Sequence, residues 1–318
     1  MEEKIKLIVE EALDCRVLKI HKISEGFSHF NFEADINKEP KKAIVRFSNN
    51  EKEEYDLAKE KFIIELLLKN DIPAPRILFF HDDCMILEKL KGIRLDTIWN
   101  SISKPERLDI VKKLGRLLKK IHKIKFKNFG KITKKGIISN KGFEFKKIGN
   151  KANYSPFLRE CLSLFGEDFF RLLSYKHLST EFVTKFIKVV YTNLDIIDYS
   201  GKPTLIHGDF HKSHIFVKKK NNKWEITGII DFEFARSSSP EYDFIKLHRD
   251  NFFDDPEILK ALIEGYGPIN KKAVYIHRLM RDLGFAQVMR DSGNLKLSDR
   301  TIKDVEKRIK NPISQTSP

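Results

Sequence analysis

Short alternating runs of hydrophobic and polar residues fill the N-terminal third of the chain and predict a small antiparallel sheet. Apolar positions that alternate, or that run briefly between turn residues, are typical of strands. Such runs predict strands over residues 17–23, 30–36, 43–47, 76–80 and 84–87. Apolar residues at helical spacing predict two helices in the same region, over 1–14 and 51–69, and Pro73 and Pro75 follow the second.

Helical spacing replaces alternation after residue 95 and predicts a mainly helical region. Helices are predicted over 107–123, in two or three pieces within 154–199, and over 244–247, 256–266 and 275–289. Residues 124–154 are rich in Lys, Gly and Asn, and we expect a mobile connection there that could serve as a lid. The tail 291–318 is polar, and we expect it to end in disorder.

One stretch within the helical region, 203–236, has a strand pattern. Strands are predicted over 204–206, 215–217 and 224–230, with a polar turn at 218–223 between the last two. Polar residues with reactive side chains follow these strands. His207, Asp209 and His214 lie on the first loop, and Asp231 and Glu233 follow the last apolar run.

Two carboxylates at neighbouring strand ends suit phosphoryl transfer. Asp209 can orient and deprotonate a hydroxyl, and Asp231 can hold a divalent cation on a polyphosphate. Phosphoryl transfer requires positioning and charge neutralisation more than covalent chemistry from the protein. The order of these residues matches a kinase catalytic loop followed by its metal-binding motif.

The sequences HGDFHKSH (207–214) and IIDFEFARSSSPEYD (229–243) resemble the aminoglycoside phosphotransferase family, within the protein-kinase-like fold that includes choline kinases. That family shows His-Gly-Asp-x4-Asn, then Ile-Asp-x-Glu, then Pro-x-Tyr-Asp. The resemblance implies that Asp209 is the catalytic carboxylate and that Asp231 holds Mg²⁺. It also places His214 where the family has a metal-binding Asn, which leaves the second metal ligand open.

The resemblance also implies an α+β, two-lobe fold. A small N-terminal lobe of sheet plus helix (1–91) would bind the nucleotide, and a larger, mainly helical lobe (92–318) would bind the substrate. The turn at 24–29 would cover the phosphates, and its backbone amides could face phosphate oxygens. The implied nucleotide-binding residues are Ser24, Gly26 and Ser28 in the turn, Arg46 paired with Glu60, and Glu88 and Leu90 in the linker between lobes.

Together these features predict a kinase that uses ATP or GTP with Mg²⁺ to phosphorylate a hydroxyl of a small molecule. Glu233, Asp250 and Asp254 could form the acidic wall that a polycationic aminoglycoside needs. The net charge of +15 would slow the approach of a polycation, although salt screens much of that repulsion. An antibiotic-resistance kinase and a metabolite kinase therefore both remain open.

Two other functions also remain open at this point. The histidines His207, His211 and His214 could instead form the metal site of a hydrolase, since His is a common metal ligand. The replacement of the family's Asn by His214 could also leave a nucleotide-binding protein with weak catalysis.

Composition adds a location and excludes some partners. The three cysteines Cys15, Cys84 and Cys161 are far apart and lack metal-ligand spacing, which predicts reduced thiols and a cytoplasmic protein. No run has the length of a signal peptide core or a membrane span. The lysines are scattered through almost every segment, so we interpret the positive charge as a basic surface and expect no nucleic-acid partner.

Overall fold

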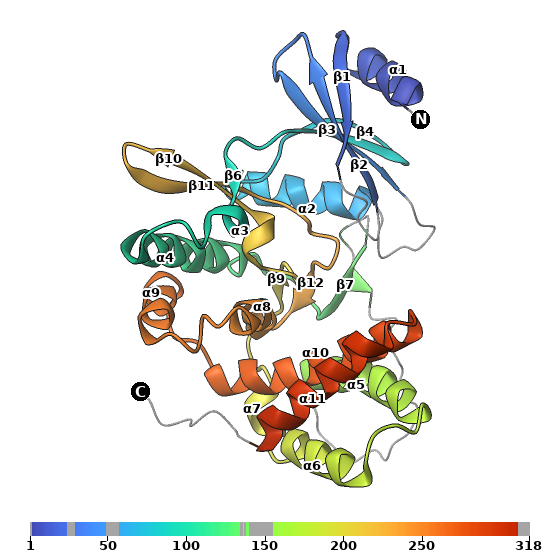
Figure 1. Ribbon diagram of the computed structural model, residues 1–318, viewed down its shortest axis with the longest axis vertical. Coiled ribbons are helices and arrows are strands. Elements are labelled where there is room, and N and C mark those ends of the chain that lie inside the picture. Colours follow the sequence, from blue (N-terminus) through green and yellow to red (C-terminus); the bar gives the residue numbers. More distant parts are fainter. Residues whose placement is uncertain are drawn as a thin grey trace.

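The computed structural model of the chain describes residues 2–23, 29–48, 57–133, 136, 138–139 and 155–310. Figure 1 shows an elongated molecule with a sheet near its N-terminal end and a group of helices at the other end. The predicted α+β class is confirmed. A division into lobes after residue 91 stays a prediction. None of the helices in the described ranges is long and apolar enough to cross a membrane.

Five antiparallel strands form the N-terminal sheet, in the order β1-β2-β3-β5-β4. Side chains alternate across a strand, so Ile86 of β5 packs with Ile5 and Val9 of α1, while Met85 and Leu87 pack with α2. One helix therefore covers each face. The elements are β1 (Val17–Lys22), β2 (His29–Ile36), β3 (Lys42–Ser48), β4 (Ile77–His81), β5 (Cys84–Glu88), α1 (Glu2–Leu13) and α2 (Leu57–Lys69). They lie close to their predicted positions, except that residues 51–56 of the helix predicted over 51–69 lie outside the described residues.

A second sheet, in the order β11-β10-β6, connects the linker to the hairpin within 203–236. Its strands are β6 (Ile93–Arg94), β10 (Ile215–Lys220) and β11 (Lys223–Ile229). The hairpin turns at Asn221 and Asn222, whose φ angles of 48° and 58° fit a tight two-residue turn. The predicted polar turn at 218–223 is therefore too long, because residues 218–220 continue β10 with their side chains exposed.

A third sheet brings the two ends of the stretch 203–236 together. Its order is β8-β7-β12-β9, and β9 pairs with β12 antiparallel, Ile206 opposite Arg236. The predicted mobile connection at 124–154 contains two of these short strands, and much of the rest of it lies outside the described residues. The strands are β7 (Gly130–Ile132), β8 (Ile138–Ser139), β9 (Thr204–Ile206) and β12 (Arg236–Ser238).

The helical region includes one helix that the sequence analysis did not predict. Part of the polar tail forms α11, because Ile302 and Val305 fall on one face and are buried beside Leu279 and Leu283 of α10. Its many charged residues hid this narrow apolar stripe. The helices are α3 (Leu95–Ile98), α4 (Lys104–Ile121), α5 (Pro156–Ser174), α6 (Thr180–Tyr191), α7 (Leu194–Ile197), α8 (Phe244–Arg249), α9 (Pro256–Tyr266), α10 (Lys271–Asp291) and α11 (Leu295–Lys310).

Helices α4 and α9 approach each other closely through two glycines. A Cβ atom on Gly115 would lie 2.6 Å from the carbonyl oxygen of Leu262, and a Cβ on Gly265 would overlap the carbonyl oxygen of Lys112. This contact brings the ends of the two helices together. His122, which caps α4, has its Nδ1 2.9 Å from the hydroxyl of Tyr266, the last residue of α9.

A buried carboxylate then fixes the loop that follows β9. Asp243 is fully buried and accepts hydrogen bonds from the backbone N–H groups of His207 (2.9 Å) and Gly208 (2.7 Å). The Nε2 of His122 is 3.0 Å from the same carboxylate. Gly208 has a φ of +80°, and a side chain there would overlap the carbonyl oxygen of Phe234. The helical scaffold thus sets the conformation of the loop through Asp243.

We predict that Gly265→Ala destabilises the protein by about 1–3 kcal/mol, because the added methyl group forces α4 and α9 apart. Equilibrium denaturation measures this change in the free energy of unfolding. Gly166→Ala in α5 is the control, since its Cβ position has no described atom within 4 Å apart from its chain neighbours and the backbone of its own helix. That control should stabilise the helix by about 0.5–1 kcal/mol. Equal effects of both substitutions would contradict the close α4–α9 contact.

We predict that Asp243→Asn lowers the free energy of unfolding by about 1–3 kcal/mol. Both carboxylate oxygens now accept hydrogen bonds from backbone N–H groups, and in the variant an amide NH₂ group, which can only donate, would face one of those N–H groups. Thermal unfolding and amide hydrogen exchange of the loop 207–209 would measure the effect. Asp82→Asn, at an exposed turn, is the matched control and should change neither. Unchanged exchange protection in Asp243→Asn would show that this carboxylate does not hold the loop.

Candidate functional site

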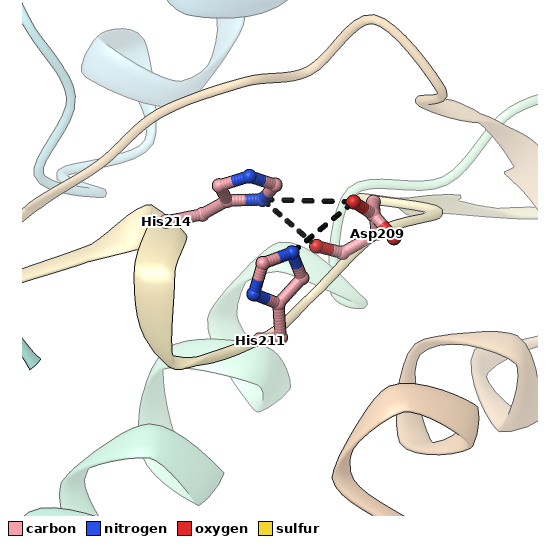
Figure 2. A group of neighbouring side chains, drawn as sticks. All are labelled: Asp209, His211 and His214. Carbon is pink, nitrogen blue, oxygen red and sulfur yellow. Dashed lines mark hydrogen bonds and ion pairs between the residues drawn. The ribbon is translucent and has the colours of Figure 1, made fainter. Parts of the chain in front are cut away.

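The loop between β9 and β10 brings one aspartate and two histidines into contact. Figure 2 shows His211 and His214 both turned towards Asp209. The distances are 3.2 Å from His211 Nε2 to Asp209 Oδ2, and 3.0 Å from His214 Nδ1 to the backbone oxygen of Asp209. A 3-10 turn over Lys212–His214 folds the loop back on itself and makes this arrangement possible.

His207 has a structural position in this loop. Its side chain is fully buried, its Nδ1 accepts the backbone N–H of Asp209 (3.2 Å), and its Nε2 donates to the carbonyl oxygen of Ile230 (2.9 Å). Burial lowers its pKa to about 4, and the charge of His214 acts in the same direction. The ring is therefore neutral with both nitrogens in use, which argues against His207 as a metal ligand.

Hydrogen bonds determine which nitrogen of His211 carries the proton. A backbone N–H can only donate, so Nδ1 of His211, 3.3 Å from the N of Ser213, must accept. The proton of the neutral ring is then on Nε2, which donates to Asp209 Oδ2. His211 thus fixes one oxygen of the Asp209 carboxylate.

His214 bridges the two aspartates of the site. Its Nδ1 faces the carbonyl oxygen of Asp209 and must donate, while its Nε2 lies 3.1 Å from Asp231 Oδ2. Burial disfavours the charged ring, but the hydrogen bond to Asp231 and the negative charges of Asp231 and Asp209 outweigh burial and raise the pKa of His214. The surroundings of the ring therefore favour its protonated form more than water does.

Asp231 follows β11 directly and has a left-handed backbone, with φ of 71°. This conformation is uncommon for a residue other than glycine and occurs where the surrounding structure holds it. Burial raises the pKa of its carboxyl, but the hydrogen bond and charge of His214 outweigh burial and lower the pKa to about 2. Asp231 is therefore ionised across the physiological pH range.

Asp209 has a cation on its other carboxylate oxygen. Lys246 of α8 places its Nζ 2.7 Å from Asp209 Oδ1. Burial raises the pKa of Asp209, but the hydrogen bond from His211 and the charge of Lys246 outweigh it and hold the pKa well below its usual range. Such a carboxylate is a weak base, better suited to orienting a hydroxyl than to removing its proton early.

A buried ion pair lies on the sheet side of Asp231. Arg46 Nη1 of β3 is 2.5 Å from Glu60 Oε1 of α2, and both side chains are almost entirely buried. Burial raises the pKa of Glu60, which Arg46 lowers only in part, and Asp231 is close enough to raise it further. Beside Glu60, Lys59 donates to the backbone oxygen of Glu233 at 2.6 Å, which ties α2 to the segment after Asp231.

The remaining predicted nucleotide-site residues occupy different environments. Ser24, Gly26 and Ser28 lie outside the described residues. Glu88 ends β5, its N–H donates to the carbonyl oxygen of Arg76 and its carboxylate pairs with the Arg76 side chain at 2.5 Å. The Leu90 side chain packs on Gly228 of β11, where any added Cβ would collide with it.

The three residues of the predicted acidic wall differ in their surroundings, and one of them, Asp250, is paired with a cation. Asp250 Oδ2 lies 3.0 Å from the Nζ of Lys212, and Asp254 is exposed to solvent. Glu233 is partly buried after Asp231. Of these three residues, Asp254 presents the carboxylate most open to solvent.

The spacing of Asp231 and His214 would suit a divalent cation once the hydrogen bond between them is broken. Two adjacent ligands of an octahedral cation bound at about 2.1 Å lie about 3 Å apart, close to the 3.1 Å between Asp231 Oδ2 and His214 Nε2. Donation from Nδ1 to a carbonyl is the usual second contact of a ligating histidine. Asp209, His211 and His214 also offer atoms within 4.8 Å of one another, close enough to hold a metal ion.

Sequence reasoning did not assign two residues that define this site. Asp243 belongs to the quoted Pro-Glu-Tyr-Asp motif, so the motif itself could have marked it as the anchor of the loop. Lys246 lies in an ordinary amphipathic run, Phe-Ile-Lys-Leu, and carries no local signal. Only the packing of α8 beside the loop brings Lys246 to Asp209.

Comparison with known proteins places this geometry in a family. The Phosphotransferase enzyme family matches residues 19–278. Among solved structures, APH(2″)-IIIa with GDP and kanamycin has a TM-score of 0.72 at 15% identity, covering 98% of this chain and 100% of that chain. APH(2″)-IIa with streptomycin and ATP has a TM-score of 0.67 at 14% identity, covering 97% and 98%.

A thermostable mutant of APH(4)-Ia, with ADP and hygromycin B, has a TM-score of 0.67 at 13% identity, covering 98% of this chain and 99% of that chain. At such identities these likenesses show a shared fold. The family match is independent of them and covers most of the chain, including the loop, the hairpin and the Pro-Glu-Tyr-Asp motif. The chain therefore belongs to the Phosphotransferase enzyme family and is a phosphotransferase, as its resemblance to aminoglycoside phosphotransferases implied.

Proposed function

We propose that the protein transfers the γ-phosphoryl group of ATP or GTP to a hydroxyl of a small molecule, with Asp209 at the acceptor and Asp231 at the nucleotide. The observation that carries this proposal is that Asp209 and Asp231 lie on either side of one histidine: His214 Nε2 is 3.1 Å from Asp231 Oδ2, and its Nδ1 is 3.0 Å from the backbone oxygen of Asp209. A kinase needs one carboxylate that orients the hydroxyl and another that holds a cation on the phosphates.

We propose that Mg²⁺ is the cation and that Asp231 holds it, with His214 as a second candidate ligand. When bound, the cation neutralises negative charge on the phosphate oxygens. Carboxylate oxygen is the hard ligand that Mg²⁺ prefers, whereas imidazole nitrogen suits Mn²⁺, Co²⁺ or Zn²⁺ better. His214 Nε2 lies 3.1 Å from Asp231 Oδ2, and that nitrogen could ligate a cation only when it carries no proton.

In the reaction, Asp209 orients the acceptor hydroxyl towards the γ-phosphorus. The hydroxyl oxygen forms a bond to phosphorus while the bond from phosphorus to the β–γ bridging oxygen breaks, and the nucleoside diphosphate leaves. The hydroxyl proton passes to Asp209. Its low pKa means that this transfer occurs late, when the hydroxyl has become acidic through bonding to phosphorus. His211 and Lys246 hold the carboxylate in one orientation.

We propose that the remaining predicted residues complete the nucleotide and acceptor sites. Arg46, held by Glu60, would contact the nucleotide phosphates, and the turn with Ser24, Gly26 and Ser28 would cover them. Glu88 and Leu90 would border the purine. Glu233, Asp250 and Asp254 would border the acceptor. The pairing of Arg46 on β3 with Glu60 on α2 supports the phosphate assignment, because kinases pair a cation on this strand with a helix Glu when they position the phosphates.

The other sequence-based expectations have unequal support. The bonding of both His207 nitrogens speaks against the histidine-based hydrolase. A catalytically weak nucleotide-binding protein predicts nucleotide binding without turnover, which a thermal-shift screen followed by a phosphate-transfer assay would reveal. The division at residues 91 and 92, a cytoplasmic location and the lack of a nucleic-acid partner stay predictions. The three cysteines are free thiols.

We predict that Asp209→Asn lowers turnover by about 10²–10⁴-fold while nucleotide affinity is nearly unchanged, because Asp209 meets the acceptor hydroxyl. Steady-state kinetics and calorimetry with Mg-ATP measure the two quantities. Asp231→Asn is the contrasting variant and should weaken Mg-nucleotide binding as well as turnover. Asp82→Asn is the control for both. Normal Mg-ATP binding by Asp231→Asn would remove Asp231 from the cation site.

We predict that His214→Asn keeps or raises turnover in Mg²⁺ and lowers the ratio of Mn²⁺ to Mg²⁺ turnover, because an amide oxygen replaces a nitrogen ligand. Kinetics of the wild type and the variant in each metal give this ratio. A loss beyond about tenfold in both metals, about 1.4 kcal/mol, would contradict the prediction if the fold is intact. It would show that the bridge between Asp209 and Asp231 is itself required.

A further inference from the structure

The two oxygens of Asp209 face different surroundings. Oδ2 is the oxygen near His211 and His214, and His214 in turn contacts Asp231 on the nucleotide side. Oδ1 contacts Lys246, which comes from α8 in the helical region. An acceptor hydroxyl that approaches Asp209 from the helical region therefore meets Lys246 beside the carboxylate.

Lys246 is held in place and still open to a ligand. Phe244 and Leu247 of α8 are fully buried, and their packing fixes the orientation of the helix. The Lys246 side chain keeps 36% of its surface exposed, and its ammonium group contacts only Asp209 among the charged groups of the described residues. An ammonium has three donors, so Lys246 can hold Asp209 and an anion at the same time.

Most of the acidic residues that could attract a polycation already form an ion pair or cap a helix. Asp250 is paired with Lys212, whose ammonium also lies over the Trp99 ring, 5.1 Å from its centroid. Asp255 caps α9 by accepting from the N–H groups of Glu257 and Ile258. The Glu257 carboxylate pairs with Lys104. Asp254 is exposed and has no ion pair among the described residues, whereas the ammonium group of Lys246 lies directly against Asp209, where the acceptor hydroxyl is proposed to bind.

We infer that the acceptor is a hydroxyl compound bearing an anionic group, a carboxylate or a phosphate, which binds Lys246 while its hydroxyl lies on Asp209. This inference rests on the proposed function and adds the chemical class of the acceptor. A charge-assisted hydrogen bond from an ammonium to a carboxylate or phosphate oxygen is stronger than a neutral one. The net charge of +15 favours the approach of an anion and opposes that of a polycation.

The experiment compares matched acceptors in Mg-ATP and Mg-GTP. The panel contains neutral sugars, the corresponding sugar acids and sugar phosphates, and kanamycin as a polycation. Nucleoside diphosphate release and the mass of the phosphorylated product measure kcat/KM for each compound. We expect the anionic sugars to be the best acceptors, and their advantage to shrink as salt is added.

Variants of Lys246 test whether that lysine is the cause. Lys246→Gln should lower kcat/KM for anionic acceptors relative to neutral ones by about 10–100-fold, the size expected for a hydrogen bond to a charged group. Lys246→Glu should lower the ratio further. The ratio is the informative readout, because a general disturbance of Asp209 would slow all acceptors alike. Lys188→Glu, exposed on α6, carries the same charge change and is the control.

Each outcome decides the inference or the function beneath it. Kanamycin or neutral sugars as the best acceptors of the wild type, or an unchanged ratio in a folded Lys246→Gln, would overturn the inference. Turnover that depends on Asp209 but reaches no anionic acceptor would also overturn it, and would leave the proposed kinase function standing. The absence of any Asp209-dependent nucleotide turnover would instead refute the proposed function.

Discussion

The buried carboxylate of Asp243 is the constraint on which the rest of the site depends. It accepts two successive backbone N–H groups, from His207 and Gly208, and contacts His122 on α4. Because a buried carboxylate is costly unless its oxygens are hydrogen-bonded, the helices and the loop can adopt this arrangement only together. The packing of α4 on α9 places His122, His122 contacts Asp243, and Asp243 holds the loop that carries Asp209. The position of Asp209 therefore depends on that helix packing.

Apart from Asp243, ion pairs and hydrogen bonds to the carboxylates of Asp209 and Asp231 determine the arrangement of the site. Asp209 and Asp231 both lie beside the His214 ring, and their negative charges, with the hydrogen bond to Asp231, outweigh burial and raise the pKa of that ring. Lys246 and His211 then hold the Asp209 carboxylate. Such fixed dipoles and charges suit a reaction in which the protein positions groups and stabilises charge. The same arrangement explains why Asp209 is a weak base.

Much of the fold followed from local pattern. Hydrophobic and polar residues alternate along 17–88 because the sheet has one helix on each face. In β5, successive side chains point to opposite faces of the sheet and pack on different helices. The pattern was weakest where charged residues outnumber apolar ones. The polar tail hid α11, and the lysines at 218–220 were taken for a turn although they continue β10, because an edge strand tolerates exposed charges.

The sequence by itself determined which carboxylates are candidates for the reaction and in what order they come, because Asp209 and Asp231 occupy short motifs whose spacing is read along the chain. It also marked Arg46 and Glu60. The family resemblance predicts that these two residues pair, and in the structure Arg46 Nη1 lies 2.5 Å from Glu60 Oε1. Only the tertiary structure decided which charges surround Asp209. Lys246 is distant in sequence and carries no motif, and Asp250 is neutralised by Lys212 through folding of the loop beside α8. The reason is physical: a motif fixes local backbone geometry, whereas electrostatic environment depends on contacts between elements that are far apart in the chain.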